Sequence, residues 1–382
     1  MMQVVFLSNY FSHHQKPISD VLAERCHYTF LATEELSQER KSLGWGQEQQ
    51  PDYVCNYFTE TQRATECLEQ ADVVIAGSAP EALIQQCIRS GKVVLRYSER
   101  PLKNGSEPLK YVPRLIRWHH RNPKYKPVYL LCASAFAASD YAKFGLFRGK
   151  AFRWGYFPEV KCYADGKALM AQKQKHTILW VGRFLDWKHP DDAIYVASQL
   201  KEMGIPFDMT LIGTGPMECQ LRQQIDEQQL HACIHLAGSM KPEDVRMYME
   251  RSQIYLFTSD RKEGWGAVLN EAMNSGCAVV ASHAAGATPY LIQHEKDGLV
   301  YRSGDREQLL ENVKQLLLSP ERSADLGFHA YEKIYREWNA EIAANRLLDL
   351  INAILRKEKN LHLFIQGPCS AAPVMNENSY NK

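Results

Sequence analysis

The sequence has no excess of either charge, no long apolar run, no C-x-x-C pair and no D-x-D triplet. With 45 basic and 44 acidic residues the formal net charge is +1, so no overall field draws the chain to nucleic acid. No stretch approaches the roughly 20 apolar residues that a membrane-spanning helix requires. Because D-x-D is missing, an obligatory divalent metal is not indicated, and we expect neither a metal site nor a cofactor.

The ten cysteines are scattered, and most lie inside apolar stretches. Their spacing fits neither a zinc knuckle nor a thioredoxin-type motif, so we interpret them as small buried hydrophobic residues. Such cysteine usage suits a reducing compartment. The chain opens on QVVFLSNYF without a basic lead, which predicts a first strand rather than a secretion signal. We therefore expect a cytoplasmic protein.

Length and patterning predict two α/β domains. At roughly 100–200 residues per domain, 382 residues make two domains the natural expectation. Short apolar runs alternate with longer amphipathic stretches, which predicts mostly parallel sheets covered by helices. We predict a first domain over residues 1–158, a second over 174–337, a helix over 338–358 and a disordered tail over 360–382. The predicted strands are Val4–Leu7, Tyr28–Leu31, Val73–Ala76, Val93–Arg96, Tyr129–Ala133 and Ala151–Trp154 in the first domain, and Thr177–Val181, Asp208–Ile212, Ile234–Leu236, Ile254–Phe257, Ala278–Ala281 and Leu299–Val300 in the second.

The segment SDRKEGWGAVLNEAMNSG, residues 259–276, carries most of the predicted chemistry. It follows a predicted strand and opens a predicted helix, where ligands bind in open α/β sheets. Gly264 and Gly266 allow the backbone to approach a ligand closely, and the free amides of the helix start suit a diphosphate. Glu263 and Glu271, about two helical turns apart, can bind sugar hydroxyls on either side of that diphosphate. A helix cap with a solvated glutamate would explain the same residues.

The loop VGRFLDWKHPDD, residues 181–192, follows another predicted strand of the second domain. Arg183 and Lys188 are two cations at the end of a buried strand, and such cations can neutralise a diphosphate leaving group. A surface ion pair is the alternative interpretation of the same two residues.

Two further loops of the second domain hold glycines. Gly213 and Gly215 in LIGTGPMEC invite a dinucleotide interpretation, but Glu218 stands where the fingerprint G-x-G-x-x-G needs a small residue. A tight strand-to-helix turn explains these glycines equally well. Exposed backbone groups of Gly238, Ser239 and Met240 could pair with the edge of a nucleobase, although a loop without a ligand is an equal alternative.

Two segments of the first domain offer polar side chains. The loop NYFSHHQKP places His13 and His14 after the first strand, where one of them could bind a substrate or move a proton. Adjacent histidines point apart on any regular element, so we do not expect a shared metal site. Glu99 and Arg100 in RYSERP are candidate groups for binding an acceptor. A capping pair of histidines and a structural ion pair at Arg100 are the alternatives.

Taken together, these loops resemble the retaining GT-B glycosyltransferases of glycosyltransferase family 4, over about residues 176–356. The resemblance is carried by VGRF with its following lysine, by IGTGP, by EGWGAVLNE with its two glutamates, by CAVVASHAAGATPYLI at 277–292 and by DGLV at 297–300. NYFSHHQKP and WGYFPE are similar to a bacterial branch that assembles surface polysaccharides. The resemblance implies two Rossmann-like domains facing an interdomain cleft, with a final helix that crosses back onto the first domain.

The resemblance also implies roles for the candidate residues. Glu263 would contact the transferred sugar and Glu271 the ribose, while Arg183 and Lys188 would bind the phosphates. The backbone around Gly213 would form the family's glycine-rich turn, and the backbone of Gly238, Ser239 and Met240 would meet the base. The amides of the donor loop would cap the phosphates; these belong to Gly264, Trp265, Gly266, Ala267 and Val268.

The expected activity is that of a retaining hexosyltransferase-type glycosyltransferase (EC 2.4), with UDP as the default nucleotide. The acceptor would be a hydroxyl of a glycan or a lipid-linked molecule in polysaccharide biosynthesis, and His13, His14, Glu99 and Arg100 would lie on the acceptor side. A lipid-linked acceptor fits peripheral contact with the inner face of the membrane, although the sequence shows no persuasive basic amphipathic segment. A nucleotide-sugar epimerase and a non-catalytic sugar-nucleotide-binding partner of an assembly complex are the alternatives.

Overall fold

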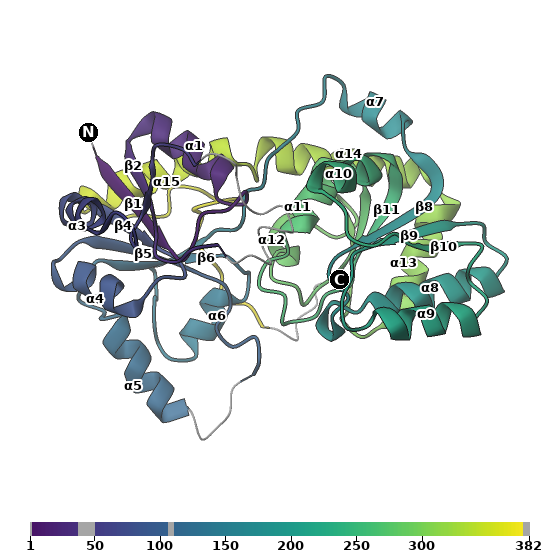
Figure 1. Cartoon of the computed structure of the whole chain (residues 1–382), viewed down its shortest axis with the longest axis horizontal. Helices are drawn as coiled ribbons and strands as arrows, with labels where there is room; N and C mark the ends of the chain where they lie inside the picture. The colour runs from purple at the N-terminus through teal and green to yellow at the C-terminus, as the bar shows by residue number, and fades with distance from the viewer. Residues whose placement is uncertain (1, 37–49, 106–110, 377–382) are drawn as a thin grey trace. The chain divides into compact units, whose positions relative to one another are not determined.

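The computed structural model describes residues 2–36, 50–105 and 111–376 (Figure 1). The described chain divides into two compact units. Unit 1 contains the chain up to Glu159 together with Trp338–Asn376, and unit 2 contains Val160–Glu337. The segment after Trp338 therefore groups with unit 1 although it follows unit 2 in sequence.

Unit 1 is built on a seven-stranded parallel sheet with the order β3-β2-β1-β4-β5-β6-β7. Its strands are β1 (Gln3–Ser8), β2 (His27–Ala32), β3 (Val54–Asn56), β4 (Val73–Ala76), β5 (Val93–Ser98), β6 (Val128–Cys132) and β7 (Ala151–Arg153). Its helices are α1 (Lys16–Arg25), α3 (Thr61–Gln70), α4 (Glu81–Arg89), α5 (Tyr111–Arg121), α6 (Ala137–Ala142) and α15 (Ala340–Leu355). The strands are buried on both sides, as a sheet covered by helices on both faces requires.

The helices of unit 1 cover the two faces of this sheet. Ala64 and Leu68 of α3 and Ile84 of α4 pack with Val5 and Leu7 of β1 in one apolar core. Figure 1 shows α1 and α15 together on the other side of the strands. An ion pair between Arg25 and Glu341 joins these two helices.

Unit 2 is built on a six-stranded parallel sheet with the order β10-β9-β8-β11-β12-β13. Its strands are β8 (Gln174–Val181), β9 (Asp208–Ile212), β10 (Ile234–Leu236), β11 (Ser252–Phe257), β12 (Ala278–Ser282) and β13 (Leu299–Tyr301). Its helices are α7 (Gly166–Ala171), α8 (Pro190–Glu202), α9 (Glu218–Glu227), α10 (Pro242–Arg251), α11 (Ala267–Asn274), α12 (Thr288–Leu291), α13 (Arg306–Leu318) and α14 (Pro320–Arg336). Pro190, Pro242 and Pro320 each occupy the first residue of a helix, where the missing N–H has no helical partner to lose.

The chain order of the strands reverses once in each sheet. In unit 1 the reversal falls between β1 and β4, and in unit 2 it falls between β8 and β11. Ligands of open α/β sheets bind outside the carboxyl ends of the strands at such a reversal. The loops after β8 and β11 hold residues 182–189 and 258–266, so the sheet order alone brings the two richest candidate loops together.

The predicted disordered tail needs a correction for residues 367–372. The amide of Arg153 donates to the carbonyl of Ser370 at 2.7 Å, and the amides of Cys369 and Ala372 donate back to β7 at 2.8 and 3.0 Å. This segment therefore extends the open edge of the sheet in the antiparallel direction. Its Gly, Pro and Ser content suggested disorder, but β7 offers backbone partners that composition does not reveal. Residues 377–382 lie outside the described part of the chain.

Across residues 2–36, 50–105 and 111–376, no helix combines the length and the apolar character needed to cross a membrane.

Candidate functional site

An ion pair joins the two loops that flank the strand-order reversal of unit 2. Nζ of Lys188, from the loop after β8, lies 2.6 Å from Oε2 of Glu263, from the loop after β11. The Ser259 hydroxyl donates to the same carboxylate oxygen at 3.0 Å. Both charged side chains are largely buried, with 14% and 11% of their surface exposed. Lys188 and Glu263 were predicted as separate members of one site, and the structure brings them into direct contact.

Hydrogen bonds between the two loops hold this ion pair in place. The Thr258 hydroxyl donates to the carbonyl of Lys188 at 2.6 Å and accepts a hydrogen bond from the Trp180 indole at 2.8 Å. The amide of Asp260 donates to the carbonyl of Trp187 at 2.9 Å. These hydrogen bonds hold the main chain on both sides of the ion pair in place without a ligand.

A second contact between the same loops involves His189. This residue has a left-handed backbone, with φ of 49°, and its Nε2 lies 3.5 Å from the Asp260 carboxylate. The hydrogen bond to Asp260 raises the pKa of His189, which burial alone would lower. Burial would raise the pKa of Asp260, but hydrogen bonds from His189 and from the Lys262 amide lower it overall. This supporting role of His189 was not predicted from the sequence.

The start of α11 presents a row of unused backbone donors. Among the described residues, no acceptor is found for the amides of Gly264, Gly266, Ala267 and Val268. Gly266 caps the helix with φ of 94°, and a Cβ there would lie 2.3 Å from the Phe257 ring. Only glycine fits this position, because any side chain would collide with the aromatic ring that supports the turn. Free amides at a helix start form a site suited to an anion.

Trp265 contributes to this loop in a different way from its neighbours. Its side chain is 1% exposed, and its indole N–H donates to Oδ1 of Asn270 at 2.9 Å. The ring therefore belongs to the core beneath the turn and is not available to a ligand.

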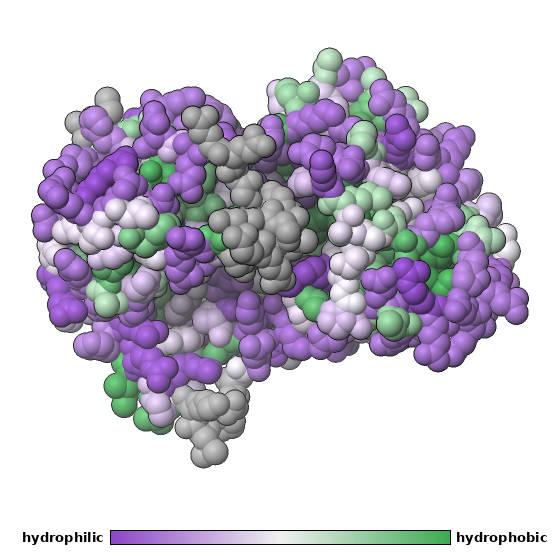
Figure 2. Space-filling model, viewed as in Figure 1, coloured by the Kyte–Doolittle hydropathy of each residue, from purple (hydrophilic) through white to green (hydrophobic). Residues whose placement is uncertain are grey.

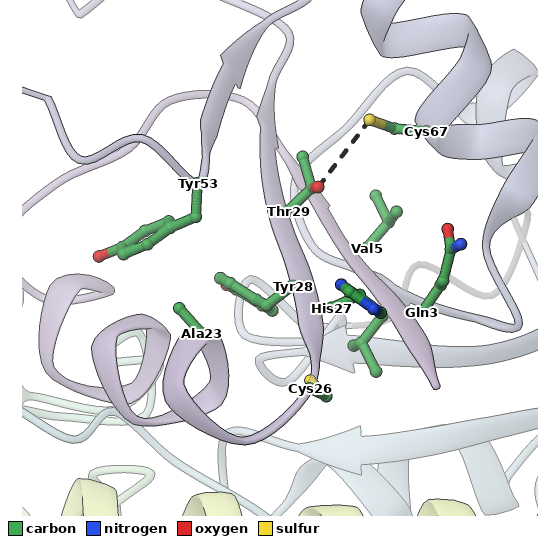
Figure 3. A pocket seen from close by; sticks show the side chains of 10 residues that line it. Gln3, Val5, Ala23, Cys26, His27, Tyr28, Thr29, Tyr53 and Cys67 are labelled. Carbon is green, nitrogen blue, oxygen red and sulfur yellow. Dashed lines mark hydrogen bonds between the residues drawn. The ribbon is translucent and has the colours of Figure 1, made fainter. Parts of the chain in front are cut away.

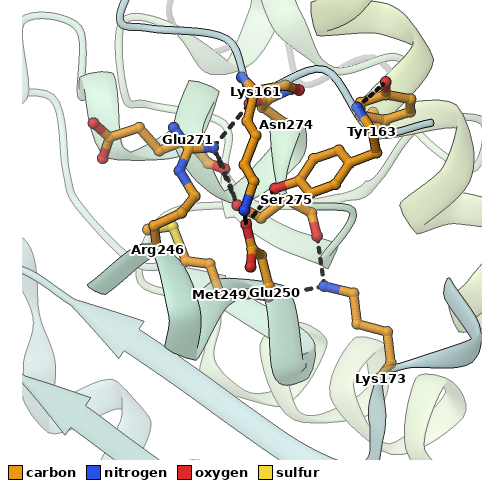
Figure 4. A network of polar contacts seen from close by, with 10 residues as sticks. Lys161, Tyr163, Lys173, Arg246, Met249, Glu250, Glu271, Asn274 and Ser275 are labelled. Atoms are coloured by element: carbon orange, nitrogen blue, oxygen red, sulfur yellow. Dashed lines mark hydrogen bonds and ion pairs between the residues drawn. The ribbon is translucent and has the colours of Figure 1, made fainter. Parts of the chain in front are cut away.

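Glu271 lies one turn into α11, with its carboxylate unpaired. Four residues after Ala267, it lies about 6 Å further along the helix axis and on the same face. No described residue donates to its carboxylate, and burial raises its pKa, against a smaller lowering effect of Arg246. Figure 4 shows the carboxylate pointing away from the neighbouring polar network. An acid kept in a low-polarity position without a partner is a candidate for contact with a ligand.

That polar network fixes the carboxyl end of α11 (Figure 4). Asn274 accepts from Nη1 of Arg246 and from the amide of Lys161, both at 2.8 Å, and donates to the Lys161 carbonyl at 3.1 Å. The buried ammonium of Lys173 donates to the carbonyls of Met249 and Ser275 at 2.8 and 2.6 Å. These residues were not predicted from the sequence, because nothing in their positions in helices or polar segments indicates that their side chains meet at the end of α11.

In the loop after β9, Gly213 and Gly215 are required because the backbone of another loop packs closely against them. A Cβ on Gly213 would lie 1.8 Å from the carbonyl oxygen of Gly182, and one on Gly215 would lie 2.6 Å from that of Phe184. The amide of Gly213 donates to the carbonyl of Gly238 at 2.7 Å, which ties this loop to the one after β10. The tight-turn interpretation thus accounts for Gly213 and Gly215, and the predicted contact of Gly213 with a donor stays a prediction.

The remaining candidates of unit 2 lie at the same edge of the sheet. Arg183 is exposed, and its guanidinium makes no ion pair or hydrogen bond with any described residue. Ser239 is also exposed, and Gly238 has a left-handed backbone with φ of 72°. With Met240 they complete a set of loops after β8, β9, β10 and β11, all at the carboxyl edge.

In unit 1 the two histidines after β1 lie together. The ring centroids of His13 and His14 are 3.9 Å apart, because both residues lie in a turn and not on a regular element. The expectation that they point apart is therefore wrong. Burial lowers the pKa of both, and burial followed by the charge of His13 lowers the pKa of His14 to about 3. Within the described chain, no group of three or more His, Cys, Asp or Glu side chains could hold a metal ion.

Arg100 is a structural residue. Its side chain is 1% exposed and lies 3.1 Å from the Asp140 carboxylate, which also accepts from the Leu102 amide at 3.0 Å. The alternative of a structural ion pair is the one that this geometry supports, and Arg100 is not available to an acceptor. Glu99 is different, because its partly exposed carboxylate accepts from the Tyr156 hydroxyl at 3.1 Å and lies 3.4 Å from the Lys103 ammonium.

A cavity of about 280 Å³ opens near the amino ends of β1 and β2 (Figure 3). Tyr28, Tyr53, Cys26 and Cys67 are among its lining residues. The Tyr28 hydroxyl is 2.8 Å from the Ser19 hydroxyl, and the Tyr53 hydroxyl donates to Asp20 at 2.6 Å. The cavity lies away from the carboxyl edge, and both tyrosine hydroxyls already have partners within the protein, so we do not assign a ligand to it.

Two units with parallel Rossmann-like sheets define the GT-B fold, which confirms the predicted fold class. The structure of Alr3699/HepE from Anabaena, solved in complex with UDP, aligns over 92% of this chain and 100% of that chain, with a TM-score of 0.70 and 14% identity. This likeness concerns the fold.

Sequence comparison places a known domain over most of unit 2. Residues 165–333 match the family model described as Glycosyl transferases group 1. The chain is 30% identical over 189 residues to the amylovoran biosynthesis glycosyltransferase AmsK of Erwinia amylovora, covering 48% of this chain and 46% of the relative. It is 27% identical over 183 residues to the putative colanic acid biosynthesis glycosyltransferase WcaL of Escherichia coli K12, covering 46% and 45%. The chain thus spans about half the length of these relatives.

Proposed function

We propose that the protein is a glycosyltransferase that moves a sugar from a nucleoside-diphosphate sugar to a hydroxyl of a glycan or lipid-linked acceptor. The observation that carries this proposal is the Lys188–Glu263 ion pair at the strand-order reversal, next to the unused amides at the start of α11. Cations and amides at one place suit a diphosphate, and carboxylates beside them suit sugar hydroxyls. The match of residues 165–333 to the group 1 glycosyl transferase model supports the same class.

Each group has a distinct role in this proposal. Arg183 and Lys188, with the amides of Gly264–Val268, would bind the two phosphates and stabilise the charge that develops as the nucleotide leaves. Glu263 would accept hydrogen bonds from the transferred sugar, and Glu271 from the ribose. The backbone of residues 238–240 would meet the base.

The proposed reaction keeps the anomeric configuration and needs no obligatory divalent metal. The departing phosphate would assist deprotonation of the acceptor hydroxyl on the same face of the sugar, so we assign no covalent nucleophile. UDP is the default nucleotide. An acceptor in polysaccharide biosynthesis is supported by the names of the two relatives, which concern amylovoran and colanic acid. We propose a hexose as the transferred sugar. On the acceptor side we retain His13, His14 and Glu99.

The first test is thermal stabilisation of the purified protein by UDP, GDP, ADP, CMP and NAD. A ligand at 100 times its dissociation constant adds roughly 2.7 kcal/mol to the stability of the folded state. We expect one nucleoside diphosphate to stabilise the protein and Arg183→Ala to weaken that effect. Arg302→Ala is the matched control, because Arg302 is also an exposed arginine of unit 2.

Stabilisation by NAD alone, or equal loss in both arginine variants, would remove the assigned donor site. Turnover of the donor sugar is then followed with and without glycan acceptors. Conversion of the donor to an epimer without any acceptor would favour the epimerase alternative, and binding without turnover would favour a partner protein.

A further inference from the structure

Helix α5 is attached to unit 1 by one side only. Leu115 and Trp118 face the apolar core, and the Trp118 ring lies 4.6 Å from Phe144 and 4.9 Å from Tyr141. At either end of the same side, Tyr111 stacks on Phe144 at 4.9 Å and His119 bonds to the Phe144 carbonyl at 2.8 Å. The spacing 111, 115, 118 and 119 is that of one helix face. No residue of α5 is buried, so this contact is shallow.

A second face of α5, about a quarter of the way round the helix from the attached face, carries exposed apolar residues. Val112 and Ile116 lie one turn apart on one face and are 60% and 65% exposed. Pro113 is exposed beside them. Tyr125, shortly after the helix, is 86% exposed and stands between Lys124 and Lys126. Figure 2 shows hydrophobic side chains gathered over α5 among hydrophilic ones.

The same segment is strongly basic. Residues 111–126, YVPRLIRWHHRNPKYK, contain Arg114, Arg117, Arg121, Lys124 and Lys126 and no acidic residue, in a chain whose net charge is only +1. Arg121 faces Glu81 at 3.8 Å, and Arg114 lies 5.9 Å from the Trp118 ring. Arg117 and Lys124 make no ion pair with any described residue. Positive charge is thus concentrated beside the exposed apolar stripe.

We propose that α5 and residues 122–126 form a docking surface for an anionic phospholipid bilayer. The apolar stripe would enter the boundary between headgroups and acyl chains, and the cations around it would meet the lipid phosphates. Tyrosine between two lysines is a side chain suited to that boundary. A protein partner would not require an uncompensated row of cations, and a soluble polyanion would not require Val112 and Ile116. The expectation that no segment is basic and amphipathic is wrong for this helix. In the sequence, Val112 and Ile116 cannot be told apart from Leu115 and Trp118, and only the structure shows which of these apolar residues pack on the core and which are exposed.

This surface is independent of the donor site, which belongs to unit 2. If the proposed function is correct, docking on a bilayer would bring unit 1 to the plane in which a lipid-linked acceptor is held. Failure of donor binding would leave the docking proposal intact, and failure of docking would leave the donor site intact.

The test is cosedimentation of the whole protein with vesicles of phosphatidylcholine alone and of equimolar phosphatidylcholine and phosphatidylglycerol. We expect binding to the anionic vesicles only, decreasing with salt. Val112→Gln with Ile116→Gln should weaken it by about tenfold or more, since two exposed apolar side chains no longer insert. Arg117→Gln with Lys124→Gln should weaken it by roughly 30-fold, about fivefold for each cation.

Matched controls separate this surface from general effects. Leu318→Gln removes an apolar side chain that is also 65% exposed, and Lys167→Gln with Lys175→Gln removes the same charge from an exposed part of unit 2. Both controls should bind vesicles as the parent does. Urea unfolding of every variant shows whether the substituted unit keeps its fold.

Three outcomes would overturn the proposal. The first is absence of binding to anionic vesicles. The second is equal binding to soluble dextran sulfate with no effect of Val112→Gln and Ile116→Gln, which would identify a polyanion site. The third is self-association that these two substitutions abolish while vesicle binding is absent, which would identify an interface between copies of the chain.

Discussion

Lys188 and Glu263 are separated by 75 residues in sequence, and their charged atoms lie 2.6 Å apart. The contact spans the strands β8 and β11, which are neighbours in the sheet. A hydrogen bond from Ser259 completes the surroundings of the carboxylate. Loss of either charged partner should therefore affect both the site and the stability of unit 2.

We expect Lys188→Met to destabilise the protein by roughly 1–3 kcal/mol, because the Glu263 carboxylate keeps its burial and loses its cation. Glu263→Gln should cost less, because the amide can still bond to Ser259. The double variant should be more stable than the sum of the two single effects predicts, since the contact is lost only once. Urea unfolding of the four proteins measures this coupling, and strict additivity would contradict it.

Turnover should fall further than stability in the same variants. If the proposed function is correct, removing the Lys188 cation should lower kcat by about 10²–10³-fold, the size of effect expected for a group that stabilises developing charge. Rates measured well below the unfolding temperature separate the two effects. An unchanged kcat in folded Lys188→Met would remove this residue from the mechanism.

Glu271→Gln should stabilise the protein without ligand at neutral pH and abolish stabilisation by the nucleotide. Burial raises the pKa of Glu271 in the folded state, so the native protein binds more protons than the unfolded chain between the ordinary and the raised pKa. Stability contributed by this group therefore falls as pH rises through that window, and an uncharged amide avoids the loss. Thermal unfolding across the acidic and neutral range measures it.

The control for this prediction is Glu243→Gln, which changes an exposed glutamate of α10. It should alter neither the pH dependence nor the nucleotide effect. A Glu271→Gln protein that is less stable at neutral pH, yet still stabilised by the nucleotide, would show that the carboxylate has a structural role.

Gly213→Ala should destabilise unit 2 by about 3 kcal/mol or more. The added Cβ would lie 1.8 Å from the Gly182 carbonyl oxygen, so the backbone of one loop must move. Gly204→Ala is the matched control, because Gly204 also has positive φ, at 68°, but nothing within 4 Å of the added atom. It should lose only about 1 kcal/mol, from backbone strain. Urea midpoints compare the two, and similar losses would contradict the packing argument.

His14 should make unit 1 sensitive to mild acid. Its folded-state pKa of about 3 lies below the ordinary histidine value, so the unfolded chain takes up the proton first as pH falls. The stability that neutral His14 contributes is complete above about pH 6.5 and decreases below it, by roughly 1–2 kcal/mol between about pH 7 and about pH 5. Urea unfolding of His14→Gln should show a smaller acid loss than the parent. His362→Gln, at an exposed histidine, should behave as the parent does.

Regular elements were predictable where apolar runs and turn residues agreed. The strands Val73–Ala76, Asp208–Ile212 and Ile234–Leu236 have the predicted bounds. The strand Val54–Asn56 was missed, because it is short and ends on asparagine, a residue that is depleted in strands. Tertiary context decides such a short edge strand, since its hydrogen bonds come from β2.

The site was predictable as a set of loops and not as a set of contacts. Spacing placed Glu263 and Glu271 on one loop and helix, but it could not show that one is paired with a lysine and the other is unpaired. Arg100 has the same chemical character as Arg183. Only the fold shows that Arg100 is buried against Asp140 and that Arg183 is exposed. The burial of a side chain and the group it pairs with depend on strand order, which cannot be read from the sequence.

The division of unit 1 between the two ends of the described chain affects how the protein is made. Residues 160–337 form one continuous unit, so its sheet can close as soon as they leave the ribosome. Unit 1 must wait, because α15 and the 367–372 segment that complete it are synthesised after unit 2. During synthesis the domain nearer the amino end normally folds first. Here unit 2 can fold before unit 1 is complete. During that interval, α1 and the edge of β7 would be without the surfaces that cover them, which is when a nascent chain most needs protection from aggregation.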